Sequence, residues 1–196
     1  YAYSTVNEMD VLNVTPTSYM QRIASLLRDA AYEILLAVQR LKKHPAVAID
    51  HAQRAKALEN RVEGVYREAI ADLFSGPEDV HHIVEMLKMR EVYRHLSNAA
   101  DRGDEAARPA ILELLAASED EAVRVAAIGA IDFLGSPEEL PVVMTYLCEG
   151  SDAEKSAARQ CLVRLRGETV PGLIVDEIQS NESVIKVALI EILAAR

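Results

Sequence analysis

The second half of the chain repeats itself, and this repeat limits the fold more than any other feature of the sequence. Pro109 precedes Gly135 by 26 residues, and Pro141 precedes Gly167 by the same interval. Pro171 lies at the matching place in a third unit. A polar break falls at a similar offset in each unit, at residues 118–120, 150–152 and 180–182. Each unit therefore predicts a helical hairpin, which cannot bury its apolar face alone and must stack on its neighbours.

The first half predicts three long helices. Apolar residues recur there at intervals of three and four, and no segment alternates with period two for long. Ser18 and Gln21 form a capping signal for the first helix, which should run to about Lys43. The second helix opens at Pro45 and ends at the Ser-Gly-Pro turn, and the third spans residues 78–107. Long helices with short connections predict an antiparallel bundle, and the whole chain should be all-α.

The composition excludes several classes of function. Half of the residues are hydrophobic and 27% are charged, as in ordinary globular proteins. No apolar run is long enough for a membrane helix and no leader opens the sequence, so a cytoplasmic location is expected. Residues 109–196 contain 7 Lys and Arg against 15 Asp and Glu, which argues against nucleic-acid binding. Cys148 and Cys161 fall at helical positions that should face inward.

The segment SEDEAVRVAAIGAIDFLGSPEELPVVMTYL, residues 118–147, resembles a HEAT repeat. Asp120 matches the acidic turn of that repeat, Val123 and Arg124 match its Val-Arg pair, and Ala127 matches one of the alanines that follow. The resemblance extends over about 109–196 and implies an α-solenoid of about three repeats. Proteins with such repeats mostly supply concave surfaces for proteins or peptides.

The first part resembles the PhoU-like family of phosphate-transport accessory proteins. The resemblance is carried by ALENRVEGVYREAIADLF and by MLKMREVYRHLSNAADRGDEAA, with Lys88, Glu91, Tyr93 and Asp101-Arg102 at the family's positions. It covers residues 1–107, which correspond to the later part of such a domain. The resemblance implies association with a phosphate transporter or sensor protein, with the protein peripheral to the inner membrane through that transporter.

Carboxylates four residues apart are the chemical mark of that family. At this spacing two side chains point to one face of a helix, and neighbouring helices can surround a cation with oxygen ligands. The resemblance implies a divalent or trivalent ion, either iron, zinc or magnesium. The candidate ligands are Asp29, Glu33, Glu59, Glu63 and Asp101. Ser97 stands where the family has a further acid, and the alternative is that these acids are ordinary partners of surface arginines.

The two parts meet within Asn98–Leu115 without a linker. Proline is tolerated in a first helical turn, so Arg108 is expected to end one helix and Pro109 to begin the next. This gives two domains, 1–107 for the partial bundle and 108–196 for the solenoid. The abrupt junction and the absence of the bundle's opening helices also favour a truncated or spliced chain.

Our first hypothesis is a non-enzymatic regulator or adaptor of phosphate transport, with a protein-interaction surface on its HEAT repeats. No glycine-rich phosphate loop or nucleophile motif is present to indicate an enzyme. The alternatives are a HEAT-type scaffold or engineered fusion without phosphate-related activity, and a metal-dependent hydrolase. A bundle without its opening helices should expose an apolar face, so we expect a homo-oligomer formed through residues 19–41 and 52–73.

Overall fold

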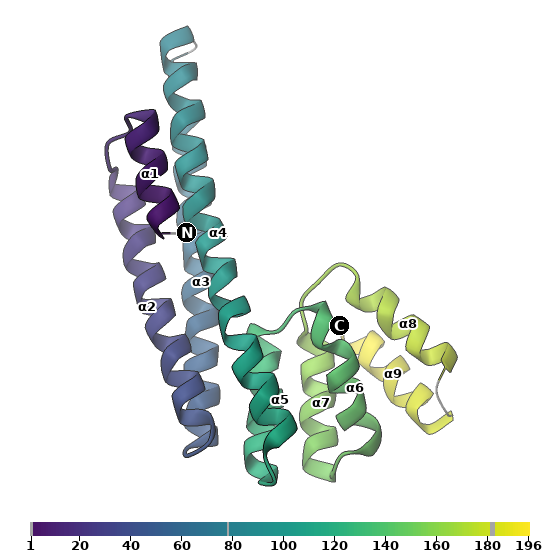
Figure 1. Cartoon of the computed structure of the whole chain (residues 1–196). Coiled ribbons are helices and arrows are strands. Elements are labelled where there is room, and N and C mark those ends of the chain that lie inside the picture. The colour runs from purple at the N-terminus through teal and green to yellow at the C-terminus, as the bar shows by residue number, and fades with distance from the viewer. Residues whose placement is uncertain (1, 78, 181–182) are drawn as a thin grey trace. The chain divides into compact units, whose positions relative to one another are not determined.

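A computed structural model describes residues 2–77, 79–180 and 183–196, and no strand occurs in these ranges. This confirms the all-α prediction. The elements shown in Figure 1 are helices α1 (Ala2–Leu12), α2 (Ser18–Leu41), α3 (Pro45–Leu73), α4 (Val80–Ala117), α5 (Glu121–Leu134), a short 3-10 helix η1 (Pro137–Glu139), α6 (Leu140–Glu149), α7 (Asp152–Arg164), α8 (Val170–Ser180) and α9 (Ser183–Ala195).

The chain forms two compact units, and neither is a continuous segment. Unit 1 comprises residues 1–34 and 54–104, and unit 2 comprises residues 35–53 and 105–196. The end of α2 and the beginning of α3 therefore pack with the repeats. A single domain boundary after residue 107 would assign these two segments to the first domain instead. The proposed division into domains 1–107 and 108–196 stays a prediction.

Unit 1 is held together by one apolar core that α2, α3 and α4 share. Ile23 of α2, Val62 of α3 and Val92 of α4 are all buried in it. Tyr93 is buried beside them and shares a 2.8 Å hydrogen bond with the Thr17 hydroxyl. Burial raises the pKa of Tyr93 above its ordinary value, so this phenol remains protonated.

Two parts of unit 1 differ from the sequence prediction. Helix α1 was not expected, although its inward residues Thr5, Met9 and Leu12 are spaced by four and three. The helix boundary expected between Arg108 and Pro109 is wrong, because α4 continues through Pro109 to Ala117. Proline lacks one backbone N–H and so loses a single helical hydrogen bond, and its ring is on the exposed side of α4.

Unit 2 is built from hairpins that bury one face each. Helix α6 packs against α7, and α8 packs against α9. The end of α4 leads into α5 through the short connection at residues 118–120. Helix α7 packs against both α5 and α9. Leu115 and Leu147 each stand six residues after the proline of their unit, so the repeat predicts equivalent core positions for them. Both are buried, 1% and 8% exposed, which confirms this register.

Residues 35–53 cover the first hairpin of unit 2. Ile49, near the start of α3, approaches Gly129 of α5 so closely that a Cβ at Gly129 would lie 3.0 Å from the Ile49 Cδ1 atom. A side chain at position 129 would therefore require the Ile49 side chain to shift by a few tenths of an ångström. The α2–α3 connection thus acts as the first layer of the stack, before the hairpin that contains α5.

The cysteines belong to the packing of unit 2. Cys161 is fully buried in α7, as predicted, whereas Cys148 in α6 is only half-buried. Burial raises the pKa of both thiols, most strongly that of Cys161. Both side chains therefore stay in the weakly reactive thiol form at neutral pH.

Two polar clusters join successive hairpins. In the first, Arg108 donates to the Ser136 hydroxyl at 2.6 Å, and Ser136 forms a capping box with the buried Glu139. In the second, the Arg124 Nε atom donates to the buried Glu154 carboxylate at 2.5 Å, and Ser151 forms a capping box with Glu154. In each cluster an arginine of α4 or α5 binds a Ser-x-x-Glu turn of the next hairpin, Arg108 the turn at 136–139 and Arg124 the turn at 151–154.

The repeat core gives a first prediction. Replacing Leu147 by alanine leaves a cavity between stacked hairpins, which should lower the free energy of unfolding by roughly 2–5 kcal/mol. Chemical denaturation measures this loss. Val175→Ala, at a position 43% exposed on α8, is the matched control and should change stability by less than about 1 kcal/mol. Equal losses for the two variants would show that the assigned register is wrong.

The second polar cluster gives a prediction about pH. Burial alone would raise the pKa of Glu154, but hydrogen bonds from Ser151 and Arg124 outweigh it and hold the pKa below its ordinary value of 4.5. The ionised carboxylate therefore adds stability that is complete above this ordinary value and is lost as the pH falls through the lower folded-state pKa.

Glu154→Gln should accordingly be less stable than the wild type at pH 7, and the difference should shrink at pH values well below 4.5. Thermal melts across this range measure it. The exposed Glu149→Gln is the control, with no such narrowing expected. A constant difference between wild type and Glu154→Gln at all pH values would contradict the assigned role.

Candidate functional site

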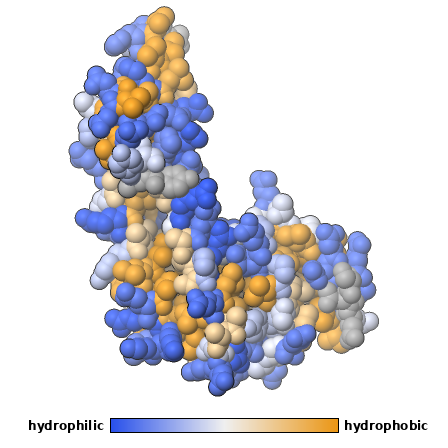
Figure 2. Space-filling model, in the orientation of Figure 1, coloured by the Kyte–Doolittle hydropathy of each residue, from blue (hydrophilic) through white to orange (hydrophobic). Residues whose placement is uncertain are grey.

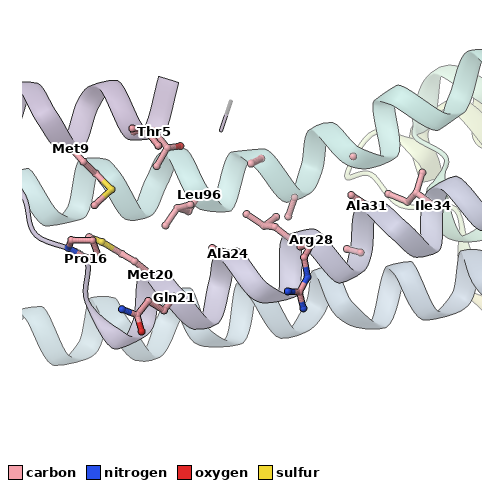
Figure 3. A pocket seen from close by; sticks show the side chains of 16 residues that line it. Thr5, Met9, Pro16, Met20, Gln21, Ala24, Arg28, Ala31, Ile34 and Leu96 are labelled. Carbon is pink, nitrogen blue, oxygen red and sulfur yellow. The ribbon is translucent and has the colours of Figure 1, made fainter. Parts of the chain in front are cut away.

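An apolar groove of about 590 Å³ runs along unit 1 between α2 and α4, with α1 over one end (Figure 3). Its floor and walls are mainly aliphatic side chains, alanines and one glycine. The lining residues are Thr5, Val6, Met9, Pro16, Met20, Gln21, Ala24, Leu27, Arg28, Ala30, Ala31, Ile34, Leu96, Ala99, Ala100 and Gly103.

Helix α1 fills only part of this groove. Figure 3 shows Met9 of α1 near Met20 of α2 at the covered end, while Ala31 and Ile34 lie beyond the beginning of α1. Thr5 is 4% exposed, whereas Val6 on the next position is 59% exposed. The groove therefore already holds one helix, and its remaining length stays open to solvent.

Small residues shape the open part of the groove. Ala24 and Ala31 are exposed on α2, and Ala99 and Gly103 are half-buried on α4. A Cβ at Gly103 would approach the Ile34 Cδ1 atom to 3.0 Å, so the walls are already close together there. Such surfaces let the backbone of another helix come near, because few side-chain atoms hold it away.

The rim of the groove is nearly neutral. Arg28 is the charged residue among those that line it, and its guanidinium donates to the Asp29 carboxylate at 2.8 and 3.0 Å. Both side chains are well exposed, so this pair contributes little to stability. An occupant would be recognised mainly through its apolar side chains.

The structure separates the five predicted carboxylates. Asp29 lies in a polar hollow between α2 and α3 that Arg22, Arg61 and Glu68 also line. Glu33 is half-buried on α2 and lines neither this hollow nor the groove. The Arg22 guanidinium binds Glu68 across this hollow at 3.0 Å.

The other three carboxylates do come together. Glu59 and Glu63 of α3 line a small hollow of about 50 Å³ with Ser97 and Asp101 of α4. The Lys56 ammonium forms an ion pair with Glu59, so a cation from the chain itself already neutralises this side chain.

Across the described ranges, no group of three or more His, Cys, Asp or Glu side chains has a geometry that could hold a metal ion. Metal binding by Asp29, Glu33, Glu59, Glu63 and Asp101 stays a prediction. Its test is a thermal melt with iron, zinc or magnesium: an ion at a hundredfold excess over its dissociation constant would add about 2.7 kcal/mol. An unchanged melt, alike in wild type and Glu59→Gln, would reject the metal site.

The hairpins of unit 2 are also matched by a known family. Residues 89–163 match the family of HEAT repeats. The match begins within α4 and ends within α7, so it covers the α4–α5 and α6–α7 hairpins. It starts 20 residues before the expected beginning at Pro109 and does not include α8 and α9. The HEAT-repeat prediction is confirmed for the matched hairpins.

No PhoU-like family match accompanies the HEAT repeats. Comparison with curated proteins and with solved structures also gave no match. None of the helices in the described ranges is long and apolar enough to cross a membrane. HEAT repeats suggest a helical scaffold that mediates contacts between proteins.

The sequence prediction missed the groove, although a signal for it was present. Ala24 and Ala31 are seven residues apart, and Ala99 and Gly103 are four apart, which places each pair on one face of its helix. Small residues at these intervals indicate that another helix can pack closely. Finding the groove would also have required the α2–α4 pairing, which no local pattern specifies.

Proposed function

We propose that this chain is a non-catalytic interaction scaffold that holds a helix of a partner protein in the groove of unit 1. The observation that carries the proposal is that α1 already lies in the same groove as a helix. The HEAT repeats of unit 2 support the general class, since they suggest a protein-interaction scaffold.

The open part of the groove sets the size of the occupant. It extends along α2 from about Ala24 to Ile34, which corresponds to about 15 Å at 1.5 Å per residue. A partner helix of about three turns would fill it, in line with α1. Such a helix would present apolar anchors at positions i, i+3, i+4 and i+7, as in other helix-in-groove complexes.

The groove also sets the chemistry of the occupant. Leu27, Ile34 and Leu96 offer aliphatic contacts, so leucine, isoleucine or methionine anchors suit it best. The Arg28–Asp29 pair leaves little net charge at the rim. Binding should therefore depend weakly on salt, unlike binding that is driven by charge.

The PhoU-like resemblance predicts a narrower class of partner, namely a transporter or sensor of inorganic phosphate. This narrower proposal rests on the resemblance of residues 1–107 alone. It requires that a cytoplasmic segment of such a transporter binds the purified chain, and that Ala31→Arg prevents this binding. If the wild type does not bind this segment detectably, the link to phosphate transport is rejected. The proposal that the groove binds a partner helix would not be affected by that result.

A labelled peptide tests the groove directly. The chain contains no tryptophan, so one Trp among the leucine anchors of a designed amphipathic helical peptide reports the peptide's environment. Its emission should shift to shorter wavelength on binding, because the indole leaves water. Ala31→Arg places a charged side chain in the open groove and should weaken binding by roughly tenfold or more, about 1.4 kcal/mol.

Tyr32→Arg is the matched control, since Tyr32 is the next residue on α2, is 60% exposed and does not line the groove. This variant should bind the peptide as the wild type does. Equal weakening by both substitutions, or equal binding to all three proteins, would contradict a site in the groove.

A further inference from the structure

The polar hollow between α2 and α3 has features that the packing of unit 1 does not explain. It encloses about 570 Å³. Unlike the hydrophobic patches that Figure 2 shows on the visible face of unit 1, it is lined mainly by polar and charged side chains, those of Arg22, Ser25, Asp29, Asn60, Arg61 and Glu68. None of its lining residues also lines the apolar groove, so the two sites can be tested separately.

Two pairs of opposite charges occupy equivalent places across α2 and α3, but only one pair is bonded. Arg22 of α2 binds Glu68 of α3 at 3.0 Å. Seven residues further along α2 and seven residues back along α3 stand Asp29 and Arg61, which line the same hollow. The Asp29 carboxylate is held instead by Arg28 of its own helix, at 2.8 and 3.0 Å. Within the described part of the chain, no hydrogen bond or ion pair involves Arg61.

Gly64 lines the hollow in the interior of α3, and the packing of the chain gives no reason for a glycine there. Glycine destabilises the interior of a helix relative to alanine. A Cβ at Gly64 would meet no atom within 4 Å, whereas a Cβ at Gly103 would come to 3.0 Å from an isoleucine side chain. The missing side chain at Gly64 therefore leaves space in which a ligand can approach the backbone of α3 closely.

The donors around the hollow suit a carboxylate. The planar guanidinium of Arg61 matches the two oxygens of a carboxylate in a bidentate pair. The Ser25 hydroxyl accepts a long bond of 3.5 Å from Arg28 and keeps its own hydrogen for donation. Asp29 and Glu68 line the same hollow and would repel a dianion such as phosphate, whereas a single negative charge balances that of Arg61.

The apolar part of the hollow suits a short aliphatic chain next to that carboxylate. Leu26 of α2 and Val65 of α3 line the hollow and are only 9% and 6% exposed, so a ligand carbon chain can rest on them. The hollow extends along α2 from Arg22 to Asp29, which corresponds to about 10 Å at 1.5 Å per residue. This length accommodates a chain of a few carbons.

We propose that this hollow binds a monocarboxylate group, whose oxygens accept hydrogen bonds from the Arg61 guanidinium. The aliphatic chain of the ligand crosses Gly64 and rests on Leu26 and Val65. A small organic acid and the glutamate side chain of a peptide both present this chemistry, a carboxylate on a short aliphatic chain.

Pentanoate is the first probe, and the measurement is the NMR signal of the Arg61 Nε–H group in the ¹⁵N-labelled 196-residue chain. This signal should shift saturably, with a dissociation constant on the order of 1 mM. Pentylammonium, of the same length and opposite charge, should cause no saturable shift. Inorganic phosphate should bind more weakly than pentanoate. Equal shifts with pentanoate and pentylammonium, or tighter binding of phosphate, would contradict the assigned chemistry.

Arg61→Lys keeps the charge but removes the bidentate donor, so it should weaken pentanoate binding by roughly tenfold, followed through the backbone signals of residues 60–68. Arg67→Lys is the matched control, because Arg67 is also exposed on α3, pairs with Glu63 and does not line the hollow. This control should bind pentanoate as the wild type does. Equal affinities in both variants would show that Arg61 does not hold the ligand.

Gly64→Ala separates binding from stability. The added methyl group favours the helix and should raise the melting temperature by about 2–4 °C, while it should weaken pentanoate binding by roughly fivefold because it fills the space that the ligand crosses. A lower melting temperature would mean that packing does require glycine at this position. Unchanged pentanoate affinity would show that the ligand does not pass over Gly64.

A pair of peptides distinguishes the two sources of the carboxylate. One is a blocked alanine pentapeptide with a central glutamate, and the other has glutamine in its place. Tighter binding of the glutamate peptide than of pentanoate, with no binding of the glutamine peptide, assigns the hollow to an acidic side chain of a protein. Binding of pentanoate as tight as that of the glutamate peptide assigns it to small organic acids. If neither pentanoate nor the glutamate peptide shifts the Arg61 signal, the proposal is wrong.

Discussion

The packing of one helical hairpin on the next is the constraint on which unit 2 depends. A single hairpin of this size leaves an apolar face in water, and only a neighbour can remove it. Helix α7 fulfils this role on both sides, since it packs against α5 and against α9. The small residues Ala126, Ala127 and Ala158 are almost completely buried at these contacts, which lets the helices approach closely.

Apolar packing alone would allow neighbouring hairpins to slide, and the polar clusters oppose this. Arg108 and Arg124 each reach about one repeat forward, to Ser136 and to Glu154. The Tyr146 hydroxyl reaches back in the same way and donates to the Leu115 carbonyl at 3.0 Å. Glu139 and Glu154 are both buried, so a shift of register would leave a carboxylate without its hydrogen bonds. These contacts therefore favour one alignment over its alternatives.

The sequence predicted well whatever depends on local pattern. The hairpin ends in unit 2 follow from prolines, glycines and capping residues, so Leu115 and Leu147 could be assigned to the core before their neighbours were known. Continuity of α4 could not be predicted, because Pro109 is compatible with a first helical turn and also with an exposed site inside a helix. The split of Asp29 from Glu59 was equally hidden, since spacing along one helix does not specify which neighbour its face meets. The groove required knowledge that α2 and α4 lie side by side.

The placement of residues 35–53 also bears on how this protein assembles from the unfolded chain. Because each unit is built from two segments that are distant in sequence, each core is complete only when those two segments have come together. A fragment cut at residue 108 would contain every repeat helix from α5 to α9 and yet leave the surface around Gly129 bare, without Ile49 to cover it. Such a fragment should be prone to aggregation, and folding of the intact chain should be slowed by the long-range contacts that close this layer. The interleaving thus makes the two units harder to separate, in evolution or in the laboratory, than their different helical patterns suggest.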